Sequence, residues 1–139
     1  MLRGLTTTNF VVDDLDSAVS WYSELLGIEP YFVREAEGTT AYAEFRIGDF
    51  QHELGFVDRR FTPPGRGSAE LGSALTYWAV DDVEAAYERL LSMGATPHED
   101  VTERGPGFVT ASVVDPFGNA LGVMYNQHYL DIVESTKGS

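Results

Sequence analysis

The sequence contains one segment twice. The copies read VDDLDSAVSWYSELLGIEP at 12–30 and VDDVEAAYERLLSMGATP at 80–97. The offset is 68 at the front, where Val12 matches Val80, and 67 at the back, where Gly27 matches Gly94, so one residue is lost near the end of the segment. An internal repeat of this length predicts two similar modules that share one fold.

Each copy predicts a helix that follows a strand. Apolar residues recur at steps of three and four, which indicates one buried helix face. In the first copy they are Leu15, Ala18, Val19, Tyr22, Leu25 and Leu26, and in the second Val83, Ala86, Tyr87, Leu90 and Leu91. Asp13 or Asp14 can cap the first helix, and Gly27 and Gly94 favour left-handed stops.

Strand patterns surround both helices in the same order. In the first half we expect strands at 5–12, 31–35, 40–47 and 50–58, and in the second at 74–80, 96–102, 108–114 and 119–126. The prediction is an α+β fold with βαβββ modules at 4–58 and 74–126. Residues 59–73, rich in Gly and Pro, predict a linker. The tail 127–139 is expected to hold a short helical turn at 129–133 and then to fray.

Composition narrows the class of protein. A chain of 139 residues with 43% hydrophobic residues is sufficient for a single domain, 1–139. Nine basic against 22 acidic residues give a net charge of −13, which disfavours nucleic acid and anionic membranes as partners. The chain has no cysteine, no apolar run of membrane-spanning length and no signal-peptide core, so we expect a cytoplasmic protein.

Beyond these patterns, the sequence resembles the vicinal oxygen chelate superfamily of glyoxalase I, bleomycin-resistance proteins and extradiol dioxygenases. The likeness spans 5–126 and is carried by VDDLDSA at 12–18, Trp21-Tyr22, Leu26-Gly27, VDDV at 80–83 and DPFGN at 115–119. It implies two βαβββ modules whose sheets form a curled mixed sheet around a cavity, usually in a homodimer. Fold motifs of this kind do not define the activity.

The resemblance also identifies where metal-dependent members carry their four ligands. The matching positions are Thr7, Glu53, Leu75 and Gly122, and only Glu53 is a good metal ligand. The resemblance therefore implies that the usual metal site is absent here, and we expect no metal and no cofactor. Three histidines lie outside the pattern and are expected at the surface: His52, His98 and His128.

Strand parity predicts an acidic wall in the first module. If Gly48-Asp49 is a two-residue hairpin loop, Glu44 lies directly opposite Glu53, with Arg46 on the diagonal. The face away from the helix then carries Tyr42, Glu44, Arg46, Gln51 and Glu53, together with Thr7 and Asn9 of the first strand. This wall suits a cation or amine, or a protonated Glu that acts as acid or base. A solvated strand face with one ion pair is the structural alternative.

In the second module the sequence predicts a wall of small, apolar and weakly polar residues. With Asp115 opposite Asn119, the face away from the helix carries Ser112, Met124 and Tyr77. Aromatic residues on the two walls are candidate stacking surfaces for a flat ligand, although aromatic residues at such positions more often serve packing than recognition: Tyr31, Tyr42, Tyr77 and Phe108.

These observations predict a protein that binds a small, cationic or aromatic organic molecule without metal. The predicted ligand-binding residues are Thr7, Asn9, Tyr42, Glu44, Arg46, Gln51, Glu53, Tyr77, Phe108, Ser112 and Met124. The alternative is a lyase, isomerase or dioxygenase of the superfamily that uses Glu53 as a displaced-metal ligand or a general base. A third hypothesis is an interaction module whose cavity is filled by its tyrosines.

Overall fold

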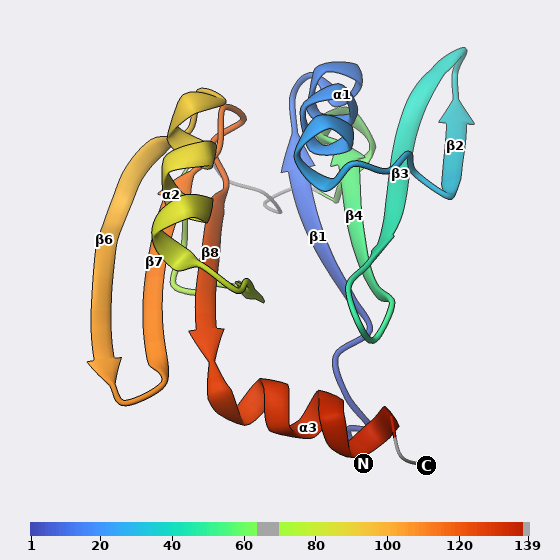
Figure 1. Ribbon diagram of the computed structural model, residues 1–139. Helices are drawn as coiled ribbons and strands as arrows, with labels where there is room; N and C mark the ends of the chain where they lie inside the picture. Colours follow the sequence, from blue (N-terminus) through green and yellow to red (C-terminus); the bar gives the residue numbers. More distant parts are fainter. Residues whose placement is uncertain (64–69, 138–139) are drawn as a thin grey trace. The chain divides into compact units, whose positions relative to one another are not determined.

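The computed structural model describes residues 1–63 and 70–137. The chain forms two compact units, Met1–Glu70 and Leu71–Ser139, each built around its own sheet (Figure 1). Part of the predicted linker, 64–69, lies outside the described residues. Among the helices of the described ranges, none is long and apolar enough to cross a membrane.

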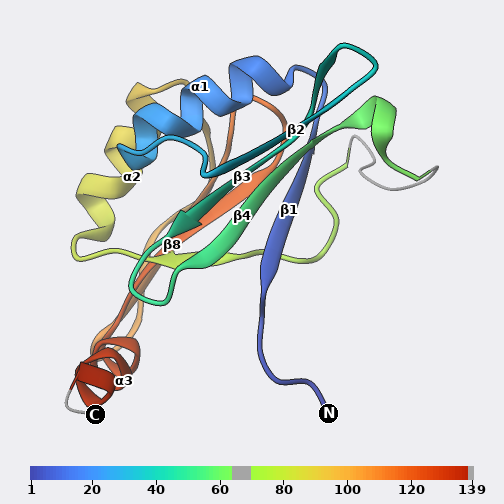
Figure 2. The same ribbon diagram turned by 90° about the vertical axis from the view of Figure 1, so that its right-hand side faces the viewer.

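Unit 1 is a βαβββ module, as the repeat predicts. Its elements are β1 (Thr7–Val12), α1 (Leu15–Leu26), β2 (Phe32–Ala36), β3 (Thr39–Ile47), β4 (His52–Asp58) and the short 3₁₀ helix η1 (Arg59–Phe61). The strand order is β1-β4-β3-β2, with β1 and β4 parallel and the other pairs antiparallel. Helix α1 covers one face of this sheet (Figure 2), and the opposite face carries the predicted acidic wall.

Aromatic side chains form the core between α1 and its sheet. Tyr22 of α1 lies with its ring 4.5 Å from that of Phe56, which also contacts Phe10 at 5.8 Å and Phe45 at 6.0 Å. Tyr22, Phe45 and Phe56 are at most 1% exposed. Burial of large rings between the helix and the sheet fixes which sheet face is left for other contacts.

Unit 2 repeats the arrangement. Its elements are β5 (Tyr77–Ala79), α2 (Val83–Ser92), β6 (Thr96–Gly105), β7 (Phe108–Val114), β8 (Ala120–Asn126) and α3 (Gln127–Lys137). The strand order is β5-β8-β7-β6, and α2 packs on β6, β7 and β8 (Figure 1). Its buried hydrophobic residues are aliphatic instead of aromatic: Val83, Leu90, Ala95, Ala111, Val113, Leu121, Val123 and Val133.

Equivalent capping residues begin the two repeated helices. The Asp14 carboxylate accepts a hydrogen bond from Ser17 N at 3.1 Å, and Asp82 accepts one from Ala85 N at 3.0 Å. The helices end before glycines with positive φ, 71° at Gly27 and 100° at Gly94. Both predicted start and stop signals of the repeat are therefore confirmed.

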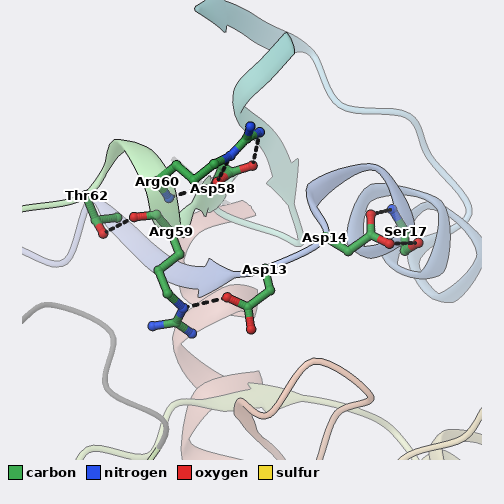
Figure 3. A network of polar contacts seen from close by, with 7 residues as sticks. All are labelled: Asp13, Asp14, Ser17, Asp58, Arg59, Arg60 and Thr62. Carbon is green, nitrogen blue, oxygen red and sulfur yellow. Dashed lines mark hydrogen bonds and ion pairs between the residues drawn. The ribbon is translucent and has the colours of Figure 1, made fainter.

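A polar network joins the end of β4 to the start of α1 (Figure 3). Arg59 of η1 pairs with Asp13 at 2.6 Å, just before the Asp14 cap. Asp58, which is 4% exposed, accepts hydrogen bonds from Arg60 Nε at 3.0 Å and NH2 at 2.8 Å. These bonds from Arg60 lower the pKa of Asp58. The parallel pairing of β1 with β4 brings these two chain segments together.

The expected hairpin between β3 and β4 is wrong in its register. Ile47 pairs with His52, not with Phe50, because the turn contains four residues, 48–51, instead of two. Gly48 and Gln51 both adopt positive φ, 76° and 54°. The register shift is two residues, so the side chains that remain in β3 and β4 keep their predicted face while their partners change.

The largest differences from the predicted boundaries occur at three elements, and the other strand ends move by one or two residues. The expected strand 74–80 is reduced to β5, and the expected strand 96–102 extends to Gly105. The tail does not fray after a short turn but forms α3 as far as Lys137. The Asn126 side chain explains the start of this helix, because it accepts hydrogen bonds from His128 N and Tyr129 N.

Candidate functional site

A buried carboxylate lies at the centre of the unit 1 face opposite α1. Glu44 of β3 is 8% exposed, and it accepts hydrogen bonds from the hydroxyls of Tyr31 and Tyr42. The Tyr42 hydroxyl also lies 3.3 Å from Asn9 Oδ1 on β1. Two tyrosine hydroxyls therefore contact one carboxyl group, and Asn9 contacts the second of these hydroxyls.

A second carboxylate lies on the neighbouring strand. Glu53 of β4 accepts a hydrogen bond from Thr7 Oγ1 at 2.6 Å and pairs with Arg46 NH1 at 3.4 Å. The Arg46 guanidinium also lies 4.5 Å from the centre of the Tyr31 ring, a cation–π distance. Arg46 thus connects the aromatic and acidic parts of the face. We call these residues the Glu44–Glu53 cluster: Thr7, Asn9, Tyr31, Tyr42, Glu44, Arg46 and Glu53.

Electrostatics make Glu44 the unusual member of the cluster. Burial is the largest cause of a raised pKa, and the negative charge of Glu53 adds to it. The Arg46 guanidinium acts in the opposite direction without cancelling the other two. Burial and the Glu53 charge destabilise the ionised form of Glu44. A ligand that supplies a positive charge or a hydrogen-bond donor would stabilise this form.

Gly55 makes space for the tyrosine that contacts Glu44. A Cβ atom at this position would lie 2.3 Å from the Tyr42 hydroxyl oxygen and 2.3 Å from Asn9 Oδ1. Gly122 has the same role in unit 2, where a Cβ would lie 2.7 Å from a ring carbon of Tyr77. Each module thus uses a glycine to let an aromatic ring lie close to the sheet.

Most of the residues predicted for unit 1 meet in this cluster, but not with the predicted partners. Glu44 lies opposite Gly55 instead of Glu53, and Glu53 lies opposite Arg46. The two carboxylates are therefore diagonal neighbours. Gln51 lies in the turn, where its amide donates to the Gly48 carbonyl, and not on the strand face. Its position follows from the four-residue turn that the sequence analysis missed.

The four residues predicted on unit 2 lie on β5, β7 and β8. Ser112 is fully buried and lies opposite Gly122, and Phe108 begins β7 with 37% exposure. Tyr77 pairs with Gly122, and the Met124 sulfur lies 3.7 Å from Asn126 Nδ2. The strand register predicted for β7 and β8 is confirmed.

Sequence reasoning missed polar partners on β6. His98 Nδ1 lies 2.8 Å from Ser112 Oγ, and Arg104 Nε donates to Thr110 Oγ1 at 3.1 Å. Glu99 lies 3.9 Å from the same His98 nitrogen. A Ser-His-Glu catalytic triad requires serine and carboxylate on opposite ring nitrogens, so this group is not one. Register irregularities in β6 re-aim these side chains, which is why simple alternation does not reveal them.

The four positions matched to the family's metal ligands do not offer a ligand set. Thr7 donates its hydroxyl to Glu53 instead of presenting an imidazole, and Leu75 and Gly122 have no donor side chain. Within the ranges that the structure covers, His, Cys, Asp and Glu residues form no group of three placed to hold a metal ion. These residues do not fit the metal site of the metal-dependent members.

Comparison with known proteins gives a family match and many similar folds. The sequence model that describes the Glyoxalase/Bleomycin resistance protein/Dioxygenase superfamily matches residues 4–123. A search of curated protein sequences finds no significant match.

Solved structures share the fold at low sequence identity. A glyoxalase-related enzyme from Fulvimarina pelagi is 19% identical with a TM-score of 0.71, covering 91% of this chain and 90% of its own. A superfamily member from Sphaerobacter thermophilus is 18% identical with a TM-score of 0.70, covering 88% and 97%. A lactoylglutathione lyase from Agrobacterium tumefaciens is 20% identical with a TM-score of 0.64, covering 93% and 98%.

Proposed function

The chain belongs to the Glyoxalase/Bleomycin resistance protein/Dioxygenase superfamily, and we propose that within it the chain binds a small organic molecule without metal. The ligand carries a cationic or strongly hydrogen-bond-donating group, which contacts the Glu44–Glu53 cluster. The observation that carries this proposal is the buried Glu44 carboxylate, with a tyrosine hydroxyl on each oxygen and a raised pKa.

The chemistry of the cluster supports a cationic group more than an anionic one. Each carboxylate oxygen has two acceptor lone pairs, so a ligand donor can bind beside the tyrosine hydroxyls. A positive charge next to Glu44 offsets its repulsion from Glu53, which an anion would increase. Arg46 is paired with Glu53 and lies against Tyr31. Its positive charge offsets the negative charge of Glu53 in the ligand-free protein, so the negative charge of Glu44 is left for the ligand.

Aromatic rings favour a flat ligand. Tyr31 and the neighbouring Phe32 are 48% and 46% exposed, with ring centroids 6.4 Å apart. Phe32 also lies 6.3 Å from Tyr42, which contacts Glu44. A ring that stacks here would hold its cationic substituent within reach of the carboxylates.

The test is a binding screen with matched pairs of probes. Aromatic ammonium compounds such as benzylammonium are each compared by calorimetry with a neutral isostere such as benzyl alcohol, in chelator-treated buffer. We expect binding of the ammonium members that Glu44→Gln weakens by about 1–3 kcal/mol, because a buried charged hydrogen bond is lost. Glu29→Gln, an exposed carboxylate outside the cluster, is the control and should bind as the wild type does.

Two results would contradict the proposal. The first is equal binding of charged and neutral probes, and the second is binding that chelator abolishes and a divalent metal restores. The second result would instead support the metal-dependent alternative with Glu53 as a ligand.

A second candidate function is acid–base catalysis on a carbonyl compound. The raised pKa of Glu44 favours it, because a carboxyl group that titrates nearer neutrality is a better proton donor and acceptor. Dihydroxyacetone in deuterated buffer is a suitable probe. Enzymatic proton abstraction predicts deuterium incorporation next to the carbonyl that Glu44→Gln abolishes, whereas equal incorporation without protein would exclude this activity on the probe.

A further inference from the structure

Unit 2 carries a cluster of one guanidinium, one imidazole and two hydroxyl groups outside the proposed ligand site. Ser112 and Thr110 alternate along β7 with Ala111 and Val113, which face the core beneath α2. The two hydroxyl residues are 0% and 4% exposed, although they lie on the face opposite this helix. Buried hydroxyls at this face need polar partners.

Both partners come from β6, and they are an imidazole and a guanidinium. His98 Nδ1 lies 2.8 Å from Ser112 Oγ, and Arg104 Nε donates to Thr110 Oγ1 at 3.1 Å. Their side chains are 35% and 48% exposed, so each is held by one nitrogen and remains partly accessible to solvent. The Ser112 and Thr110 hydroxyls, two residues apart on β7, therefore hold the His98 imidazole and the Arg104 guanidinium on the same sheet face.

A carboxylate of the chain already lies between these two groups. Glu99 Oε2 is 3.4 Å from Arg104 NH2, and Glu99 Oε1 is 3.9 Å from His98 Nδ1. Register irregularities occur on both sides of Glu99, between it and Pro97 and between it and Thr102. Such bulges turn a side chain away from its regular direction, here toward the imidazole and the guanidinium.

The Glu99 contacts are loose enough for exchange. The distances exceed those of good charged hydrogen bonds, and the Glu99 side chain is 38% exposed, a setting in which ion pairs contribute little. The guanidinium has five N–H donors, and the contacts with Thr110 and Glu99 engage two of its nitrogens. A better oriented oxyanion could therefore replace Glu99 and use the bidentate edge of Arg104.

The net negative charge of the whole chain does not prevent these four residues from binding an anion. At physiological ionic strength the Debye length is about 8 Å, so distant carboxylates are largely screened. The groups in direct contact then determine the preference, and they are one guanidinium, one imidazole and two hydroxyls against a single carboxylate.

We propose that His98, Arg104, Thr110 and Ser112 form a binding site for one oxyanion group, a carboxylate or phosphate, of a small organic molecule. Glu99 occupies this site in the ligand-free protein and competes with the ligand. The proposal goes beyond the proposed function, because it concerns a different unit and the opposite ligand charge.

The test uses acetate and inorganic phosphate as probes. NMR signals of the His98 ring and of Arg104 Nε–H are followed during titration of the full chain, with sodium chloride at equal ionic strength as the reference. We expect saturable shifts with at least one probe and not with chloride. The probe that binds more tightly distinguishes a carboxylate site from a phosphate site.

Matched variants separate a site from general electrostatics. Glu99→Gln should tighten probe binding by about two- to fivefold, because it removes an exposed competing ion pair, whereas Glu103→Gln, an equal charge change on the same strand, should change it far less. Arg104→Gln should weaken binding by about tenfold or more. Arg89→Gln on α2 is its control.

Three outcomes would overturn the proposal. These are shifts that chloride reproduces, a Glu99→Gln variant that binds no more tightly than Glu103→Gln, and equal losses in the Arg104 and Arg89 variants. The Glu99 comparison remains decisive if removal of Arg104 prevents folding.

Discussion

At the scale of single residues, Gly55 determines whether the Glu44–Glu53 cluster can form. We predict that Gly55→Ala destabilises the protein by about 1–3 kcal/mol, because its Cβ would overlap the Tyr42 hydroxyl and Asn9. Gly105→Ala is the control, since a Cβ there meets no atom within 4 Å. Denaturant unfolding measures both. Equal stabilities of the two variants would mean that the close approach at Gly55 is not a constraint.

Asp58 should make stability depend on pH at the acidic end. Its folded-state pKa is lowered by Arg60, so its contribution is present above the ordinary value of 3.8 and is lost as the pH falls through the folded value. Asp58→Asn should therefore be less stable than the wild type at pH 7, and the gap should close below about pH 3.8. A gap that stays constant down to the lowest pH would contradict the ion pair.

Glu44 should act with the opposite sign. Because its folded pKa is raised above 4.5, the folded state binds more protons just above pH 4.5, and the free energy of unfolding falls as the pH rises through that window. Glu44→Gln should remove this decline, and Glu29→Gln should keep it. Parallel stability curves for the wild type and Glu44→Gln would show that burial does not perturb this carboxyl group.

The alternation of side chains along a strand predicted on which sheet face these residues lie, but not which residues they contact. Tyr42, Glu44, Arg46 and Glu53 share the predicted face because the error in register was two residues, which preserves alternation. The partners could not be predicted, because Gln51 adopts a positive φ that its residue type does not signal. Hydroxyl contacts such as Thr7 with Glu53 depend on that register.

At the scale of elements, the two caps should be interchangeable in their effect. Asp14→Ala and Asp82→Ala should each cost about 0.5–2 kcal/mol, because each removes the acceptor for an amide in the first turn. Asp16→Ala, an exposed acidic residue in the first turn of α1, is the control and should cost less. A cost at Asp16 equal to that at Asp14 would assign the effect to charge near the helix dipole instead of capping.

Helices α1 and α2 were predictable because three signals occur together in each repeated segment. These are an apolar face, an aspartate at the N-cap and a glycine after the last turn. Helix α3 was underestimated, although the Asn126 cap and the Gln127–Asp131 pair, 3.1 Å apart, are local signals that could have extended it. Strand β5 was overestimated because alternation at 74–76 does not ensure a continuous ladder, and of these residues only Thr76 is seen to bond to β8, through its carbonyl and Gly122 N.

At the scale of the whole molecule, the repeated βαβββ modules and the family were predictable from sequence. The curling of the sheets around one cavity concerns the placement of the units and stays a prediction, as does the homodimer. Analytical ultracentrifugation should give twice the chain mass of 15.3 kDa. A species of 15.3 kDa at all concentrations would contradict the dimer.

The most direct test of the proposed function observes the carboxyl groups themselves. Carbon-13 NMR of the glutamate side chains, recorded during titration with benzylammonium in metal-free buffer, follows Glu44, Glu53 and Glu29 together. We predict saturable shifts at Glu44 and Glu53, none at Glu29, and a weaker response to benzyl alcohol. Shifts spread evenly over all three glutamates, or shifts that appear only after a divalent metal is added, would contradict metal-independent recognition by this cluster.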